Sequence, residues 1–305
     1  MSYKIQYRNL SAVTQPFSDF SFDRPGADDP AETRRAARRK RGIGPADPAA
    51  SPDFITALAR GLHVLRCFTP GATALGNHEL AALTGLPKPT ISRITYTLTS
   101  LGYLRYDAQT GRYGPGYGVL ALGYGLLAGM EIRHLARPVM ARLAEDSGAA
   151  VALGVFDRDA MTYIEAIHSS PHLYLRLPVG HRVAMHSGMG RAYLAGLPAT
   201  ERARILDGLA GATPPHALLA QAVADYAAHG YCLALGDWRP GIHAVAVPFD
   251  SPTGEGRFVM SCGGPDAVLT AEDLQQRIGP ALRRAVSDLS GAPLVQRAPS
   301  PRPVR

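Results

Sequence analysis

The sequence is poor in cysteine and contains a single tryptophan. Its three cysteines, Cys67, Cys232 and Cys262, are far apart and form no CxxC pair. This pattern excludes a disulfide framework and the ligand spacing of a zinc ribbon, and it favours a reducing compartment. Ten histidines occur, but without an HExxH motif, so we expect neither a metal site nor another cofactor.

Long hydrophobic runs are also missing. An uncharged stretch covers residues 113–130, but it contains six glycines and one proline, and its compactly apolar part is about half a membrane span. Neither a signal peptide nor a lipidation signal is visible, so we expect a cytoplasmic protein without a membrane partner. A GxSxG nucleophile motif and a dinucleotide-binding loop are absent as well, and we expect no catalytic residues.

Acidic side chains are outnumbered, with 25 Asp and Glu against 32 Lys and Arg, which gives a formal charge of +7. Residues 1–52 carry nine basic and six acidic side chains, residues 53–115 carry six and three, and the remaining chain carries 17 and 16. The excess lies near the N-terminus and indicates an anionic partner for that part. With 305 residues, 46% of them hydrophobic, the chain is long enough for two packed domains.

At neither end of the chain do apolar residues recur at the regular spacing of a helix or strand. Residues 1–52 include a basic run at 34–41, and we expect a disordered arm that is either a solvated tail or a nonspecific phosphate-binding segment. Residues 292–305 are rich in proline and predict a disordered tail with no visible role.

Helical spacing of apolar residues begins after the arm and predicts a first helix from Phe54 to Phe68. Asn77 as the cap and Gly85 as the stop predict a second, shorter helix. A third helix opens at residues 87–90 and ends at Gly102. Its apolar stripe is expected to pack inward and consists of Ile91, Ile94, Leu98 and Leu101.

Residues 103–113 predict a β-hairpin with Gly111 in its turn. Three helices followed by a hairpin are the order of a winged helix-turn-helix domain, which we expect at residues 53–115. Its outward side chains are hydroxyls and cations, the types that contact base edges and phosphates. A small three-helix domain could instead be a protein-interaction module whose cations are only solvated. The DNA-binding candidates are Lys88, Thr90, Ser92, Arg93, Thr97, Arg105 and Arg112.

Residues 79–104, which include the runs TGLPKPTISRI and LTSLGYL, resemble the DNA-binding domain of IclR-type transcriptional regulators. Pro89 stands where the family usually has serine, and proline fits the first turn of a helix. The resemblance covers residues 53–290. It implies an α+β protein with a dimerising linker helix at 116–130 and a GAF-like α/β effector-binding domain with an antiparallel sheet at 131–291.

Residues 117–129 predict the linker helix, residues 131–147 predict the first helix of the second domain, and Pro138 predicts a kink or a late start in the latter. Spacing in that helix turns Leu135 inward and Arg133 outward. Strand-like runs follow, and further helices alternate with the family's closing strands. The expected strands cover 149–156, 161–168, 173–180, 241–248 and 261–265, and the expected helices cover 186–195, 199–209 and 218–229.

The resemblance also implies a pocket for a small organic acid, formed by the start of a glycine-rich helix and by two closing strands. A helix that begins after Ser187 offers N–H donors and a positive dipole end to a carboxylate. Arg191 replaces the family's usual lysine, and Trp238 lies where an acidic pair is usual, either as an aromatic lid or as a core residue. The effector-binding candidates are Gly188, Gly190, Asp237, Trp238, Ala244, Ser261 and Gly263.

Taken together, these features predict a homodimer or a dimer of dimers that binds double-stranded operator DNA and regulates transcription. Its expected effector is a small organic carboxylate, with aromatic acids among the candidates. The alternative is a sensory or catalytic GAF-like domain whose N-terminal module contacts other proteins.

Overall fold

The computed structural model describes residues 51–169, 178–209 and 213–291. The expected arm with its basic run, the C-terminal tail and most of the strand expected at 173–180 lie outside the described residues. Contacts divide the chain into two compact units between Leu98 and Thr99, and each unit is described by itself. The domain bounds inferred from the sequence differ from this division and stay a prediction. Among the described residues, no helix is long and apolar enough to cross a membrane.

The first unit contains three helices, α2 (Thr56–Arg66), α3 (Asn77–Thr84) and most of α4 (Lys88–Ser100). The Glu79 carboxylate accepts a hydrogen bond from the Gly76 N–H at 2.8 Å and thereby caps the start of α3. Gly85 ends α3 with a left-handed φ of 69°. The three predicted helices are therefore confirmed, although α2 is shorter than expected at both ends, and the N-cap of α3 is Gly76 and not the predicted Asn77.

The inward face of α4 differs from the predicted stripe. Ile91 is fully buried, but the second buried residue is Thr95, and Leu101 is exposed. Thr95 tolerates burial because its hydroxyl donates to the Ile91 carbonyl at 3.0 Å and lies 3.4 Å from Asn77 Oδ1. The interior of this unit is thus partly polar, and the prediction that Leu101 packs inward is wrong.

The second unit starts with the expected hairpin, β1 (Leu104–Asp107) paired antiparallel with β2 (Arg112–Pro115). Helix α5 (Tyr117–Gly129) follows and has the bounds predicted for the linker helix. Gly116 is required at the junction because a Cβ there would collide with the Gly102 carbonyl. No residue of α5 is buried.

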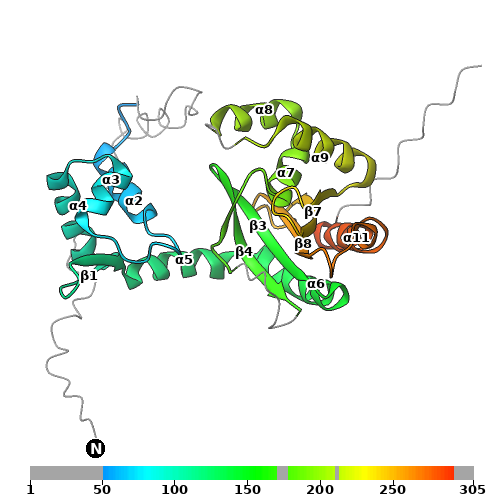
Figure 1. The fold of residues 1–305 in the computed structure, drawn as a ribbon, viewed down its shortest axis with the longest axis horizontal. Helices are drawn as coiled ribbons and strands as arrows, with labels where there is room; N and C mark the ends of the chain where they lie inside the picture. Colours follow the sequence, from blue (N-terminus) through cyan, green and yellow to red (C-terminus); the bar gives the residue numbers. More distant parts are fainter. Residues whose placement is uncertain (1–50, 170–177, 210–212, 292–305) are drawn as a thin grey trace, which may run out of the picture. The chain divides into compact units, whose positions relative to one another are not determined.

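A six-stranded antiparallel sheet forms the centre of the second unit, in the order β5-β4-β3-β8-β7-β6 (Figure 1). This sheet confirms the predicted α+β class. Its strands are β3 (Ala150–Asp157), β4 (Ala160–His168), β5 (Arg182–Ala184), β6 (Cys232–Leu235), β7 (Ile242–Asp250) and β8 (Arg257–Pro265).

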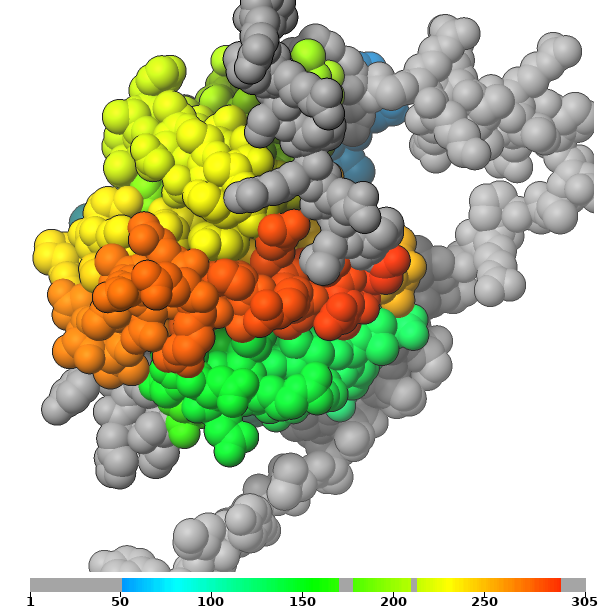
Figure 2. Space-filling view, turned by 90° about the vertical axis from the view of Figure 1, so that its right-hand side faces the viewer, coloured from blue at the N-terminus to red at the C-terminus, as the bar shows by residue number. Residues whose placement is uncertain are grey.

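Helices cover both faces of the sheet (Figure 1). One face carries α6 and α11, which Figure 2 shows side by side in green and red, while α7 and α9 pack on the other face and α8 lies beyond α7. Two hydrophobic cores therefore share one sheet. The helices are α6 (Glu131–Ser147), α7 (Gly188–Ala195), α8 (Ala199–Gly208), α9 (His216–His229), α10 (Ala271–Asp273), the π-helical turn η3 (Leu274–Ile278) and α11 (Gly279–Ser290).

The start of α6 is tied to the sheet. Arg133 donates to the Leu127 carbonyl at 2.8 Å and to the buried Glu165 carboxylate of β4 at 3.0 Å. Leu135, in contrast, is 42% exposed. The predicted directions of these two α6 side chains are therefore wrong, because a buried carboxylate on the sheet requires a cation from the helix that covers it. The late start predicted from Pro138 is also wrong, since α6 runs unbroken from Glu131.

Candidate ligand pocket and nucleic-acid interface

Strand register creates a floor of small side chains on the α7 face of the sheet. On β3, Val151 and Leu153 point into the α6 and α11 core, whereas Ala152 belongs to the opposite face. Because the strands pair in register, small residues line up across the sheet on that opposite face. One transverse row consists of His168, Ala150, Gly263 and Ala244. The adjacent row consists of Ala166, Ala152, Ser261 and Ala246. A cavity lies above these rows.

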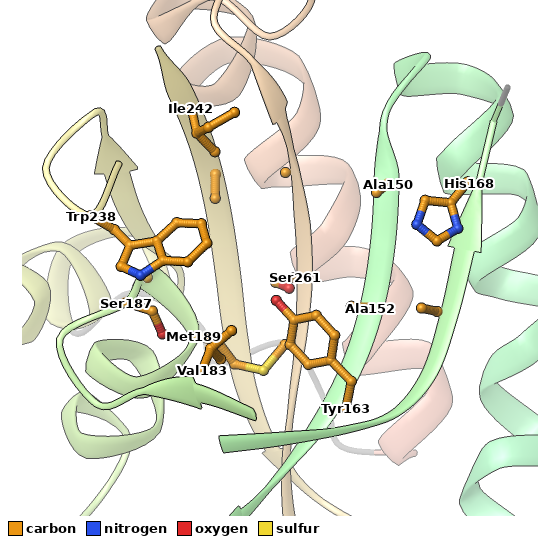
Figure 3. Close-up of a pocket in the computed structure, with 14 residues that line it drawn as sticks. Ala150, Ala152, Tyr163, His168, Val183, Ser187, Met189, Trp238, Ile242 and Ser261 are labelled. Atoms are coloured by element: carbon orange, nitrogen blue, oxygen red, sulfur yellow. The ribbon is translucent and has the colours of Figure 1, made fainter. Parts of the chain in front are cut away.

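The walls of the cavity come from three places in the chain. Tyr163 projects from β4, Trp238 from the loop between β6 and β7, and Ser187, Gly188 and Met189 from the start of α7. Figure 3 shows Trp238 on the opposite side of the floor from His168. The cavity thus combines a mostly apolar floor with aromatic walls, which is the character of a small-molecule pocket.

Two hydroxyl groups line the cavity, each on a residue that is nearly buried. Ser261 is 8% and Tyr163 6% exposed, and neither hydroxyl has a hydrogen-bond partner among the described residues. Burial raises the pKa of Tyr163 to about 12, so its phenol stays neutral and can donate a hydrogen bond. Both hydroxyls are available to a bound ligand.

The first turn of α7 supplies backbone donors at the edge of the cavity. Ser187 caps the helix by accepting a hydrogen bond from the Gly190 N–H at 3.2 Å. The first N–H groups of a helix have no partner within it and carry a positive dipole end. Gly188 and Met189 hold these positions and line the cavity, so the site can accept a carboxylate.

Five of the seven predicted effector residues lie around this cavity, namely Gly188, Trp238, Ala244, Ser261 and Gly263. Gly190 and Asp237 do not line it. A Cβ on Gly190 would lie 2.5 Å from the Met185 Cα, and Asp237 is bound to Arg191. Trp238 combines both alternatives, since it packs against the α7 core and also forms a cavity wall.

Sequence reasoning missed the wall formed by Tyr163 and the part of the floor that β3 and β4 supply. Small residues at alternate positions of β3, such as Ala150 and Ala152, were a usable signal, because a strand face without bulk leaves space. No comparable signal distinguished Tyr163, whose place at the cavity depends on strand pairing. The remaining missed residues are Ala166, His168, Val183, Ser187, Met189 and Ile242.

The predicted DNA-contacting side chains of α4 are mostly exposed. Lys88 and Arg93 are exposed and form no ion pair within the described part of the chain. Ser92 and Thr97 are exposed as well, and the Thr97 hydroxyl donates to the Arg93 carbonyl at 2.9 Å. Thr90 is half-buried. Two cations thus remain available on this helix for phosphates or base edges.

On the hairpin, Arg105 of β1 and Arg112 of β2 are also exposed. Their backbone positions are fixed by the antiparallel pairing, in which Arg112 lies opposite Asp107. The Tyr106 and Tyr113 rings pack at 4.9 Å and stiffen the same hairpin.

Comparison with known families identifies the chain. Residues 57–108 match the IclR helix-turn-helix domain, and residues 124–291 match the bacterial transcriptional regulator IclR C-terminal domain. The chain belongs to the IclR family. This IclR-family chain is an HTH-type transcriptional regulator, as its curated relatives are. The helix-turn-helix match favours this function over a protein-interaction module.

Relatives match most of the chain. The HTH-type transcriptional regulator TsaQ1/TsaQ2 of Comamonas testosteroni is 30% identical over 81% of this chain and 91% of its own length. A solved IclR-family regulator from Brucella abortus is 42% identical, with a TM-score of 0.73 over 81% of this chain and 96% of that one. An IclR homolog from Microbacterium hydrocarbonoxydans, solved in complex with 4-hydroxybenzoate, is 23% identical and shares the fold, with a TM-score of 0.60 over 77% and 98%.

Proposed function

We propose that this IclR-family regulator binds operator DNA as a homodimer and that a small planar organic acid in the α7-face cavity is its effector. The observation that supports this proposal most strongly is that the hydroxyls of Ser261 and Tyr163 bond to no described residue and line the same cavity as the first turn of α7. The complex of the Microbacterium homolog with 4-hydroxybenzoate supports this class of ligand.

Three features of the cavity favour a small ligand that carries a carboxylate. A hydrogen bond between a ligand and a protein hydroxyl contributes about 0.5–1.5 kcal/mol, so a ligand that bonds to both Ser261 and Tyr163 gains twice. The N-terminal dipole of α7 favours a negative charge next to Gly188. The aromatic and aliphatic lining favours a flat apolar body. One carboxylate on a small ring satisfies all three conditions.

A titration with 4-hydroxybenzoate followed by calorimetry tests the effector site. Ser261→Ala is expected to weaken binding about tenfold, because one hydrogen bond to a charged group contributes about 1.5 kcal/mol. Ser290→Ala is the matched control, since Ser290 bonds only within its own helix α11. Equal affinity of the two variants, or no binding of 4-hydroxybenzoate, benzoate or a short aliphatic acid to the unmodified protein, would contradict the proposal.

The DNA interface is tested with duplex DNA from the region upstream of the chain's own gene and with a scrambled duplex. Arg93→Ala is expected to weaken specific binding by about 1–3 kcal/mol at fixed salt. Arg204→Ala removes the same charge from an exposed position of α8 and should leave the affinity unchanged. If both variants bind the upstream duplex like the unmodified protein, α4 is not the recognition helix.

Dimer formation is proposed through α5, whose apolar side chains are exposed in the single chain. A helix that is apolar on all sides needs a partner surface. The exposed residues are Tyr117, Leu120, Leu122, Tyr124 and Leu126.

We also propose that the second domain senses its ligand without converting it, since the curated relatives are regulators.

A further inference from the structure

An ion pair joins α7 to the loop that carries Trp238, with its guanidinium buried and its carboxylate 24% exposed. Arg191, in the first turn of α7, is only 2% exposed, and its two terminal nitrogens donate to the Asp237 carboxylate at 2.7 and 2.8 Å. Its Nε is buried without a hydrogen-bond partner among the described residues. The buried guanidinium is costly to desolvate, and an apolar side chain of similar volume would often stabilise a fold as well or better. The role of this pair is therefore to be sought in its geometry, in which two hydrogen bonds hold the Asp237 carboxylate in one position.

Asp237 belongs to a short loop, residues 236–241, between β6 and β7. Gly236 and Gly241 flank the loop with left-handed φ values of 78° and 76°. At its base, the Gly236 N–H donates to the Ile242 carbonyl at 3.1 Å. Within the described residues, no other side-chain hydrogen bond or ion pair joins this loop to α7. The pair with Arg191 thus fixes the loop against the helix that lines the cavity.

The next residue in the loop is Trp238, which forms one wall of the cavity (Figure 3). Its ring packs partly against the α7 core, and the Arg239 guanidinium lies 5.6 Å from the ring centroid. Asp237 directly precedes Trp238 in the chain. The orientation of the indole therefore depends on where Arg191 holds Asp237.

We propose that Trp238 is a specificity-determining residue that selects flat rings, and that Arg191 and Asp237 are the positioning pair for its indole. This inference rests on the proposed function of the cavity. Indole stacking favours a planar ring over a puckered one of the same size. Arg191 does not line the cavity, and both of its terminal nitrogens donate to Asp237.

Trp238 is the only tryptophan of the chain, so intrinsic fluorescence reports this wall alone. In ligand-free protein, Asp237→Asn is expected to shift the emission to the red and to increase quenching by acrylamide. Arg191→Lys, which keeps the charge but not the two-point geometry, should give an intermediate shift. Asp250→Asn breaks a comparable pair with Arg257 elsewhere and should change neither property. Unchanged emission in a folded Asp237→Asn variant would overturn the positioning role.

Selectivity is measured by calorimetry with benzoate and cyclohexanecarboxylate, which share the carboxylate and differ in planarity. The unmodified protein should prefer benzoate by about three- to tenfold, and Trp238→Leu and Asp237→Asn should reduce this ratio to near one. An unchanged ratio would overturn the proposal. An equal loss of affinity for both acids in Asp237→Asn would also overturn the proposal, because it would indicate that the charge of Asp237, and not the position of the indole, affects binding. If neither acid binds, the proposed function and the selectivity role fail together, while the fluorescence still decides the positioning role.

Discussion

Two glycines at the start of α7 have different roles although they are only two residues apart. Gly188 lines the cavity, and a Cβ there would lie 2.8 Å from the Ala234 Cβ. Gly190 faces away from it, and a Cβ there would lie 2.5–2.7 Å from the backbone of Met185. The predicted ligand role of Gly190 is therefore better described as close packing, which lets α7 approach the segment that precedes it.

Gly190→Ala is expected to lower the free energy of unfolding by about 1–3 kcal/mol, because the backbone of Met185 cannot yield as a flexible side chain could. Urea denaturation followed by circular dichroism measures the change. Gly208→Ala is the control, since a Cβ there meets nothing within 4 Å. It should be neutral or stabilise by up to about 1 kcal/mol. Equal effects of the two substitutions would show that close packing does not explain Gly190.

Helix α6 takes its N-terminal cap from a turn more than a hundred residues away in the sequence. Glu255, in the turn between β7 and β8, accepts hydrogen bonds from the N–H groups of Glu131 and Ile132, both at 2.9 Å. Burial alone would raise the pKa of Glu255, but hydrogen bonds from Thr253 and these two N–H groups hold it below its usual value. The ionised carboxylate thus stabilises the junction of α5 and α6.

Glu255→Gln is expected to cost about 1 kcal/mol near neutral pH, as the loss of a charged helix cap does. Because the pKa of Glu255 is lower in the folded state, the stabilisation is present above the unfolded value of 4.5 and is lost as the pH falls through the folded value. The difference in Tm between the variant and the unmodified protein should therefore shrink below pH 4.5. Glu145→Gln, at an exposed position of α6, should show no such trend.

On the scale of the whole molecule, α5 joins the winged-helix elements to the effector-binding elements in sequence and exposes apolar residues all round. Tyr117 is 83% exposed, and Leu122 and Leu126 are 64% and 67% exposed. Such a surface is unfavourable in water for an isolated chain. A symmetric second copy would cover it and would pair two α4 helices for a palindromic operator.

The double variant Leu122→Glu/Leu126→Glu places two charges one turn apart on α5. It should reduce the mass measured by light scattering from that of a dimer to that of a monomer, and it should weaken operator binding. Val268→Glu introduces a charge at another exposed apolar position, outside the helices and strands, and should keep the dimer. A double variant that remains dimeric would place the dimer interface elsewhere.

Local signals in the sequence were enough for most elements. The closing glycine of α3, the turn at Gly111 and the bounds of α5 all follow from residues within a few positions of each other. The family was recognisable for the same reason, because its motifs are short runs. Local periodicity failed where a distant partner decided burial, as for Arg133, which faces Glu165, and Thr95, which faces Asn77.

The sequence by itself therefore determined the order of the elements, the α+β class and the IclR resemblance, including five residues that line the cavity. Only the tertiary structure decided that the small residues of β3, β7 and β8 form one floor, that Tyr163 closes it, and that Arg191 holds the loop of Trp238. The physical reason is sequence distance. Helix caps and turns depend on near neighbours, whereas a cavity depends on the register of strands that lie about a hundred residues apart in the chain.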